Sequence, residues 1–346
     1  MTGKEFQLAL NGDRAIELRH VPIARPTGCQ VLVTTEIVGI CATDVDLFKG
    51  TYGAPHKRPL CFGHEWAGWV EEVGSEVTHW RPGDRVTGEC SLWCGLCSHC
   101  HSNKNLCSSI KKFGITVDGA ARPRFIVDAK YLHSASASLP PELLALAEPL
   151  SVCARGLHAA HCENLAANRV LIIGGGMIGM GCLILLRHLH KVSEVFLTDL
   201  EQSRQARAIS LGAKVPEFTA ASEMEAVDYA SLYDSAGFDL VIETTGNADA
   251  FRQALSLTNP RGTVVLLGFT PETRFPVKQV VTKGLRIAGS IGGSGSFEGI
   301  IPWLESHAGV VRPLLGPCFP ASEAIAAFAA AQDRNLAPKI QLRFPA

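Results

Sequence analysis

Five cysteines fall within eighteen residues of this 346-residue chain, from Cys90 to Cys107. Four of them have the spacing of a metal-binding loop: Cys94, Cys97 and Cys100 follow one another at CxxC spacing, and Cys107 comes after six intervening residues. Four thiolates at this spacing can surround a tetrahedral zinc ion and leave no position open for a substrate. The segment is therefore predicted to fold as a lobe around a structural zinc.

Three other interpretations of this loop remain open from the residues alone. His99 or His101 could take the place of one thiol, an iron–sulfur cluster fits the same spacing, and reduced cysteines can cluster by chance. A disulfide framework is disfavoured, because such frameworks are typical of short secreted chains and the N-terminal sequence has no signal-peptide pattern. We therefore expect a reducing, cytoplasmic location and a metal-binding role for the loop.

The composition excludes several broad classes of protein. Apolar residues make up 47% of the chain and charged residues 19%, which is typical of a globular protein, and the length predicts about two domains. Basic residues number 32 and acidic residues 33, so the chain lacks the basic excess of a nucleic-acid-binding protein. The longest apolar run, residues 170–186, contains five glycines and is shorter than the ~20 residues that span a membrane. We therefore expect neither a nucleic-acid partner nor a membrane span.

The order of the predicted elements indicates an α/β protein. The first part of the chain, to about residue 150, reads as short strands separated by turns, with β-rich runs at 31–40 and 66–74. From about residue 168, apolar strand patterns alternate with helical patterns, which is typical of a doubly wound parallel sheet. The predicted strands of this second part are residues 170–174, 194–200, 238–246 and 262–269. A helix at 322–332 and a strand at 339–344 are predicted near the end of the chain.

Residues 174–179 read GGGMIG and match the GxGxxG pattern of dinucleotide-binding folds. The pattern follows an apolar strand and opens a helix, which is the context that the function requires. Gly174 would permit the tight turn, Gly176 the close approach of a pyrophosphate, and Gly179 the contact between helix and strand. The free N–H groups of the helix would then face the phosphates. The predicted cofactor residues in this motif are Gly174, Gly176, Met177, Ile178 and Gly179.

An acidic residue, Asp199, ends the next predicted strand, twenty residues after Gly179. Its carboxylate can accept hydrogen bonds from both ribose hydroxyls and would repel a 2′-phosphate, which favours NAD over NADP. Arg204 lies nearby and acts in the opposite sense, because an arginine can receive that phosphate. A glycine-rich turn without any ligand is the alternative interpretation.

A third set of residues is dispersed along the chain: Cys41 in GICATD, His64 and Glu65 in GHEWAG, and Glu148 in AEPLS. Taken singly, each is more simply interpreted as a buried structural residue. Taken together, a thiolate, an imidazole and carboxylates would suit a catalytic zinc with an open position. Spacing alone does not bring them together.

These motifs resemble the zinc-containing medium-chain dehydrogenase/reductase family, and most closely its polyol (sorbitol) and L-threonine dehydrogenase branch. The resemblance covers nearly the whole chain, and GHEWAG followed by PGDRV is its most specific part. The other motifs that carry it are GICATDVDLFKG, the four-cysteine lobe, AEPLSV, GGGMIG and GTVVLLG. It implies a GroES-like β-barrel catalytic domain at 1–150, completed by 299–346, and a Rossmann NAD-binding domain at 151–298.

The resemblance also implies roles for the dispersed residues. Cys41, His64 and Glu148 would bind a catalytic zinc, with Glu65 beside the metal as a direct or alternating ligand, and the four cysteines would hold a structural zinc. Thr43 would relay the substrate proton, and Asp44 would orient His64. The residues expected to position the nicotinamide are Leu267, Gly268, Ser290 and Ile291.

Three departures from the family pattern stand out. Asp46 occupies the position where the family usually has a relay histidine, and a carboxylate with an ordinary pKa of ~3.9 is a weaker base near neutrality. The lobe has six residues between its last two cysteines where seven are usual. Arg122 and Arg124 stand where relatives have an aromatic and acidic stretch, and they would either reach an anionic substrate group or lie on the surface.

The sequence thus predicts reversible NAD-dependent oxidation of a secondary alcohol to a ketone, with two zinc ions per chain. The expected substrate is a small polyol, sugar alcohol or cyclitol, and an L-threonine-like amino alcohol is the nearest alternative. A non-catalytic cofactor-binding module is the alternative from a different functional class. A homodimer or homotetramer is expected, because the last strand of the sheet, near residues 289–293, often pairs between subunits in this family.

Overall fold

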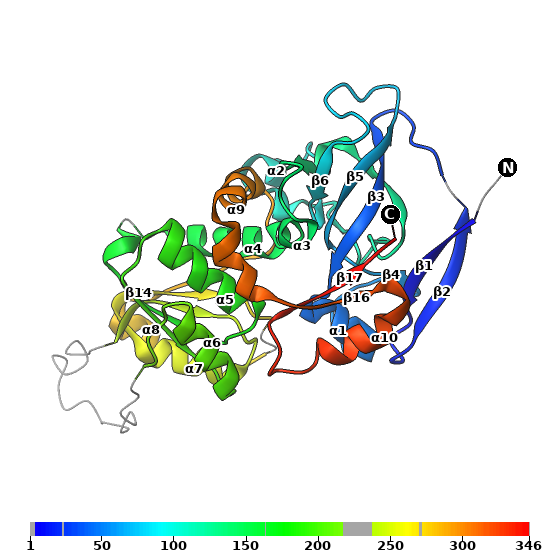
Figure 1. Cartoon of the computed structure of the whole chain (residues 1–346). Helices are drawn as coiled ribbons and strands as arrows, with labels where there is room; N and C mark the ends of the chain where they lie inside the picture. The colour runs from blue at the N-terminus through cyan, green and yellow to red at the C-terminus, as the bar shows by residue number, and fades with distance from the viewer. Residues whose placement is uncertain (1–3, 23, 163, 217–236, 270–271, 346) are drawn as a thin grey trace. The chain divides into compact units, whose positions relative to one another are not determined.

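The computed structural model describes residues 4–22, 24–162, 164–216, 237–269 and 272–345. The chain forms two compact units, one made of Met1–Ser151 with Gly292–Ala346 and the other of Val152–Ile291 (Figure 1). The first unit is discontinuous in sequence, because the chain leaves it after Ser151 and re-enters it at Gly292.

The first unit is built on a seven-stranded sheet with the order β10-β6-β5-β3-β17-β16, and β9 pairs with β3 beside this path. Strand β17, near the C-terminus, runs antiparallel to β3 from the first part of the chain (Figure 1). The bounds are β3 Gln30–Gly39, β5 Glu65–Val73, β6 Arg85–Gly88, β9 Arg124–Asp128, β10 Leu132–Ser134, β16 Leu315–Pro320 and β17 Lys339–Arg343. The smaller sheets contain β1 Lys4–Leu10, β2 Ile16–Pro22 and β4 Leu60–Cys61, and β7 Ser91–Leu92 with β8 Lys111–Lys112.

Buried apolar residues of β3 and β5 pack this sheet onto its core. Val31 and Val33 of β3 are fully buried, Leu32 between them is 5% exposed, and β-branched residues such as valine suit a pleated strand. The Trp66 ring packs edge-to-face on Phe125 with ring centroids 4.9 Å apart, which joins β5 to β9. The pairing of β3 with β5 places Gly39 opposite Glu65, at the end of the sheet where His64 and Cys41 also lie.

The second unit contains a five-stranded sheet that is parallel throughout, in the order β12-β11-β13-β14-β15. Strands β11, β13 and β14 contain runs of buried Val, Ile and Leu, as expected for the inner strands of a parallel sheet covered on both faces. The bounds are β11 Arg169–Ile173, β12 Glu194–Thr198, β13 Phe238–Glu243, β14 Thr258–Leu266 and β15 Arg286–Gly289. Strand β11 lies between β12 and β13, so successive strands are added first on one side of β11 and then on the other. Proteins of the α/β class bind nucleotides at such a switch point.

Helices connect these strands. Those of the second unit are α5 Met177–Ile184, α6 Gln202–Ser210, α7 Ala248–Leu257 and α8 Val277–Lys283. Helices α1 Ala42–Lys49, α2 Ser98–Ser102, α3 Pro141–Leu144, α9 Phe297–Val311 and α10 Ala324–Ala330 belong to the first, and α4 Ala147–Ala159 connects the two. The longest apolar run is divided between β11 and α5, and among the described residues no helix combines the length and apolarity needed to cross a membrane.

The helix after the glycine motif does not keep the α-helical period to its end. Residues 185–189 form a π-helical turn, in which the His190 N–H donates to the Leu185 carbonyl, five residues back. Leu189, the last residue of this turn, is 40% exposed.

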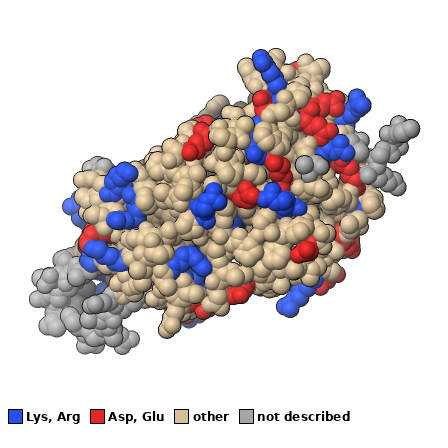
Figure 2. All heavy atoms as spheres, viewed as in Figure 1, with Lys and Arg blue, Asp and Glu red and all other residues tan. Residues whose placement is uncertain are grey.

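Charged side chains of both signs are interspersed on the face of the molecule shown in Figure 2. Arg124, one of the two arginines considered for an anionic substrate, contacts the carboxylates of Glu5 and Glu71. Its charge is thus matched within the protein. The Arg122 guanidinium donates to the Gly119 carbonyl.

Candidate active site

Cys41, His64 and Glu65 come together at one end of the large sheet in the first unit. Cys41 is the residue that precedes α1, and His64 and Glu65 stand at the start of β5. One potential ligand atom from each lies within 4.8 Å of the other two. A thiolate, an imidazole and a carboxylate form a donor set that zinc prefers, so this group fits a catalytic zinc.

Asp44 supports this group from the first turn of α1. Its carboxylate is fully buried, Oδ2 accepts a hydrogen bond from the Cys41 N–H at 2.9 Å, and Oδ1 lies 3.6 Å from His64 Nδ1. Within the described part of the chain, neither Asp44 Oδ1 nor His64 Nδ1 has a hydrogen-bond partner. Buried polar atoms are rarely left unpaired, and a carboxylate beside a metal-binding histidine is the usual means of orienting its ring.

Glu148 lies in the first turn of α4 and is buried, but it is outside the group of three whose atoms lie within 4.8 Å. Burial raises the pKa of Glu148 to about 7, an effect that His64 opposes and Glu65 reinforces. The charges of His64 and Glu65 thus act on the Glu148 carboxylate. Its role as a zinc ligand stays a prediction.

Lys339 is a member of this site to which sequence analysis assigned no role. Its ammonium contacts Glu65 Oε2 and donates to the Ile40 carbonyl at 3.3 Å, and both charged side chains are 2% exposed. Burial disfavours the charged form, but Glu65, together with Cys41 and Asp44, outweighs it and raises the pKa of Lys339. In the sequence this lysine is the first residue of the strand predicted at 339–344, and no local pattern indicates that it is buried.

Gly39 leaves the room for this ion pair. A Cβ atom there would lie 2.5 Å from Glu65 Oε2 and 3.2 Å from Lys339 Cδ. The structure therefore shows the Glu65 carboxylate in contact with an ammonium group from β17.

The charges of the catalytic group affect the pKa values of Cys90 and Tyr52. Burial raises the pKa of the Cys90 thiol to about 11, with further effects from His64, Glu148 and Cys41. Burial likewise raises the pKa of Tyr52, and Cys90 adds to the increase. No motif in the sequence links either residue to the catalytic group, because their relation to it depends on the fold alone.

Thr43 and Asp46 lie on α1, beside Cys41. Thr43 is half-buried and Asp46 is exposed. The Asp46 Oδ1 atom accepts a hydrogen bond from the Thr51 hydroxyl at 3.4 Å. The relay roles expected for Thr43 and Asp46 stay predictions.

The four cysteines of the lobe have the geometry of a tetrahedral thiolate site. The Sγ atoms of Cys97 and Cys100 are 3.5 Å apart, and the Cys94–Cys100 and Cys97–Cys107 pairs are each 3.9 Å apart. A tetrahedron of sulfur atoms at the Zn–S distance has edges of about 3.8 Å. All four belong to one potential metal site, to which neither His99 nor His101 contributes.

Backbone N–H groups prepare two of these thiols for a metal. The N–H groups of Leu96 and Cys97 lower the pKa of Cys94, and hydrogen bonds from Ser108 and Cys100 lower that of Cys97 to about 5. Such bonds stabilise the thiolate, which is the form that binds zinc. The lobe therefore fits a closed structural site.

In the second unit, the glycine motif forms the turn between β11 and α5. Gly174 has φ +106°, and a Cβ atom there would lie 2.5 Å from the Thr244 hydroxyl. A Cβ at Gly179 would lie 1.8 Å from the Gly174 carbonyl, so this contact of helix and strand requires glycine. Nothing lies within 4 Å of a Cβ at Gly176. That open side suits the approach of a pyrophosphate, with Met177 and Ile178 in the first turn of the helix.

The other predicted cofactor residues follow the carboxyl ends of the neighbouring strands. Asp199, after β12, accepts a hydrogen bond from the Gly175 N–H at 2.6 Å and lies 3.5 Å from an Arg204 nitrogen. After β14, the N–H groups of Leu267 and Gly268 donate to the Glu243 carbonyl. After β15, the Ser290 N–H donates to the Leu266 carbonyl, and Ile291 is 36% exposed. One edge of the sheet therefore carries all of these residues.

Two family descriptions match the chain in sequence. The alcohol dehydrogenase GroES-like domain matches residues 27–137, and the zinc-binding dehydrogenase domain matches residues 178–306. A D-altritol 5-dehydrogenase of Agrobacterium fabrum is 30% identical over 94% of this chain and 95% of its own length. The chain belongs to the zinc-binding dehydrogenase family. The family and the GroES-like plus Rossmann fold predicted from the sequence are confirmed.

Two further relatives of this dehydrogenase bear on its substrate and cofactor. An L-threonine 3-dehydrogenase of Anaeromyxobacter dehalogenans is 31% identical over 81% of each chain. The crystal structure of a protein from Sinorhizobium meliloti, described as a zinc-binding dehydrogenase bound to NADP, has a TM-score of 0.86 and 28% identity over 99% of each chain. A zinc-dependent dehydrogenase that uses a nicotinamide nucleotide is therefore confirmed as the class of enzyme.

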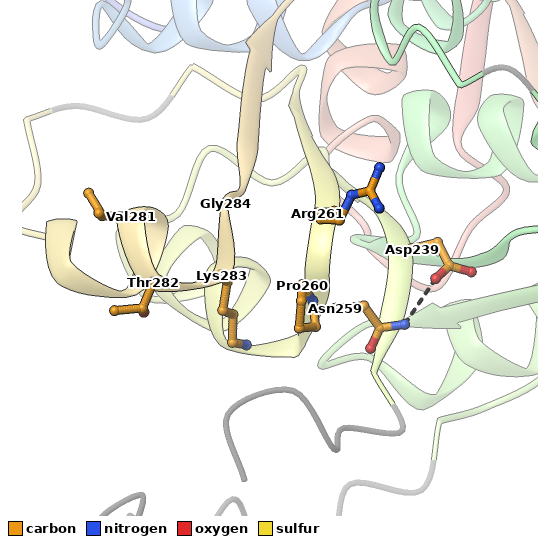
Figure 3. A pocket seen from close by; sticks show the side chains of 8 residues that line it. All are labelled: Asp239, Asn259, Pro260, Arg261, Val281, Thr282, Lys283 and Gly284. Carbon is orange, nitrogen blue, oxygen red and sulfur yellow. Dashed lines mark hydrogen bonds between the residues drawn. The ribbon is translucent and has the colours of Figure 1, made fainter. Parts of the chain in front are cut away.

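A hollow of about 600 Å³ lies at the opposite edge of the Rossmann sheet of this dehydrogenase, at the amino ends of β13, β14 and β15 (Figure 3). Asn259 donates to Asp239 there, as the dashed line in Figure 3 shows. The Lys283 ammonium donates to the carbonyls of Ser256 and Thr258. The hollow is thus remote from the glycine motif, and its lysine is bound to main-chain oxygens.

Proposed function

We propose that this dehydrogenase interconverts a secondary alcohol and its ketone by hydride transfer to and from NAD, with a polyol, sugar alcohol or cyclitol as substrate. The observation that carries the proposal is the group of Cys41, His64 and Glu65, whose donor atoms lie within 4.8 Å of one another. The buried Glu148 carboxylate, whose pKa is affected by His64 and Glu65, adds to it. The polyol class is supported by the similarity to D-altritol 5-dehydrogenase.

In this mechanism, Cys41, His64 and Glu148 would hold the catalytic zinc. A zinc ion bound there supplies Lewis acidity, which lowers the pKa of an alcohol hydroxyl to near neutrality. The Asp44 carboxylate keeps the His64 ring in place, and Lys339 holds Glu65 through its ion pair. Glu65 would lie beside the metal as a direct or alternating ligand.

The proton and the hydride leave the alcohol by separate routes. The Thr43 hydroxyl accepts the substrate proton and passes it toward Asp46 or water, since both residues follow Cys41 on α1. NAD would be held by Gly174, Gly176, Met177, Ile178 and Gly179 and would supply the hydride acceptor. Leu267, Gly268, Ser290 and Ile291 would position its nicotinamide. Asp199 would bind the ribose hydroxyls and favour NAD, while its neighbour Arg204 would limit that preference.

We assign the catalytic role to residues 1–150 and 299–346, and the nucleotide-binding role to residues 151–298. We further propose a homodimer or homotetramer, because β15, within the described residues, pairs only with β14 and leaves its other edge for a second copy. We also propose a cytoplasmic, reducing location, because no cysteine in the described part of the chain forms a disulfide.

The experiment is a substrate panel with the purified, zinc-loaded protein. Polyols, cyclitols and L-threonine are each supplied with NAD or NADP, and reduced cofactor is measured by its absorbance. We expect turnover with a polyol or cyclitol and NAD. Turnover confined to L-threonine moves the substrate to the amino-alcohol class, which the L-threonine 3-dehydrogenase relatives favour.

Zinc content separates the enzyme from a non-catalytic cofactor-binding module. Two zinc ions per chain are expected for the enzyme and one, in the cysteine lobe, for the module. Equal kcat/KM with NADP would contradict the role proposed for Asp199.

A further inference from the structure

A buried polar cluster in the first unit joins the four-cysteine lobe to the segment where the chain re-enters that unit. Asn105, only 3% exposed, lies in a short 3₁₀ turn, Lys104–Leu106, just before the last cysteine of the lobe. Its side-chain amide pairs with both backbone polar groups of Ser294: Nδ2 donates to the Ser294 carbonyl, and Oδ1 accepts from the Ser294 N–H, each at 3.1 Å. One side chain of the lobe thus binds the returning backbone as a neighbouring strand would.

The orientation of the Asn105 amide is set by two more hydrogen bonds. Nδ2 also donates to Asn103 Oδ1 at 3.1 Å, and Oδ1 also accepts from the Ser91 hydroxyl at 3.2 Å. The Ser91 oxygen in turn accepts from the Lys112 ammonium at 2.7 Å. All four hydrogen-bonding positions of the amide are therefore used. A buried network that is fully satisfied holds its members in one arrangement.

Gly292 provides a second and independent observation of this contact. It has φ +71°, and a Cβ atom there would lie 2.2 Å from Asn105 Oδ1 and 2.9 Å from the Ser91 hydroxyl. The first residue of the returning segment must therefore be glycine for the backbone to approach the lobe so closely.

Glu89 binds the side chain of Ser294. The Ser294 hydroxyl donates to the buried Glu89 carboxylate, which also accepts from Trp93 Nε1 at 2.9 Å and lies 3.2 Å from His133 Nε2. Trp93 is the residue before the first cysteine of the lobe. The backbone and the side chain of Ser294 are thus both bound to the lobe or to its immediate neighbour.

We propose that Asn105 is a positioning residue for the nicotinamide cofactor, which it serves by fixing Gly292–Ser294 against the four-cysteine lobe. Gly292 directly follows Ser290 and Ile291, the residues proposed to position the nicotinamide, and the Ser290 N–H is itself bound to the Leu266 carbonyl at the end of β14. The short connection is therefore held at both ends. The inference rests on the proposed role of Ser290 and Ile291. It implies that the four-cysteine lobe supports cofactor binding through Asn105.

The test compares Asn105→Ala with Leu106→Ala in the zinc-loaded protein. Leu106 is the matched control, because it lies in the same turn, is 55% exposed and is outside the cluster. NADH affinity is measured by fluorescence titration, zinc by metal analysis, and kcat at saturating NAD. We expect Asn105→Ala to weaken NADH binding by about five- to tenfold, which corresponds to one or two lost hydrogen bonds. Its zinc content and its kcat at saturating NAD are expected to match those of Leu106→Ala.

Equal NADH affinity in the two variants overturns the proposal, and so does a loss of lobe zinc in Asn105→Ala without a change in NADH affinity. Ser294→Ala provides a milder variant should Asn105→Ala fold poorly, since it removes only the hydroxyl that binds Glu89. About two- to threefold weaker NADH binding is expected for it, and unchanged binding again counts against the proposal. NADH titration needs no turnover, so a wild-type protein that binds NADH but oxidises no alcohol contradicts the proposed function and leaves this test intact.

Discussion

The two groups of metal-binding residues in this dehydrogenase are built in opposite ways. The cysteine lobe takes four like ligands from residues 94–107, with backbone N–H groups on the sulfur atoms. The catalytic group takes unlike donors from the ends of β3 and β5 and is supported by Lys339, which lies 299 residues from the Ile40 carbonyl it contacts. The lobe satisfies its own ligands, whereas the catalytic group leaves His64 Nδ1 and Asp44 Oδ1 without partners among the described residues. A closed local site suits stability, and an open site assembled by the fold suits chemistry.

The largest expected effect on stability comes from the lobe. Replacing Cys100 by Ser breaks the tetrahedral thiolate set, and a structural zinc contributes folding free energy directly. We expect one zinc per chain to be lost and the free energy of unfolding to fall by several kcal/mol. Metal analysis and denaturant unfolding measure both. Retention of two zinc ions would show that the lobe does not bind metal through four thiolates.

The largest expected effect on activity comes from the catalytic group. Cys41→Ser removes the thiolate ligand, so we expect kcat/KM to fall on the order of 10³-fold while the lobe keeps its zinc. Steady-state kinetics measures kcat/KM, and metal analysis of the same sample measures the zinc content. Wild-type kcat/KM with two bound zinc ions would refute the proposed mechanism. Cys182→Ser, a buried thiol of the second unit outside both groups, is the control.

The Lys339–Glu65 pair tests whether the catalytic group depends on the last strand. Lys339→Met leaves a buried carboxylate without its partner, which costs about 3–5 kcal/mol of unfolding free energy. The double variant Lys339→Met with Glu65→Gln removes the unpaired charge and is expected to recover part of that loss. Thermal or urea unfolding of the single and double variants measures the difference. Equal stability of Lys339→Met and wild type would show that the ion pair is unimportant.

The smallest of these effects is expected at Asp44. Asp44→Asn keeps the size of the side chain but removes the negative charge 3.6 Å from His64 Nδ1. Loss of such a supporting carboxylate weakens zinc affinity by about 10- to 100-fold. Competition with a chelator, followed by zinc release, should show one weakened site and one unchanged site per chain. Equal weakening of both sites would contradict the assignment of Asp44 to the catalytic group.

Patterns that depend on neighbouring residues were predictable from the sequence. The CxxC spacing, the GGGMIG turn and the apolar strand runs act over a few residues, and β11, β12 and β13 lie where their apolar patterns predict them. The boundary of β14 was less predictable, because Thr258–Leu266 begins before the expected residue 262 and its last predicted residues leave the sheet as a loop. Leu189 ends a π-helical turn and is 40% exposed, and the apolar pattern contains no signal for such a turn.

The sequence by itself determined the four-cysteine lobe, the glycine turn and, through resemblance, the family to which the chain belongs. Only the tertiary structure showed that Lys339 pairs with Glu65, that the charges of the catalytic group affect the pKa values of Cys90 and Tyr52, and that Asn105 binds the returning backbone at Ser294. The physical reason is the range of the interactions. Turn geometry and metal spacing are decided by residues close in the chain. A buried ion pair or amide contact depends on strand pairing between segments hundreds of residues apart, for which no local pattern exists.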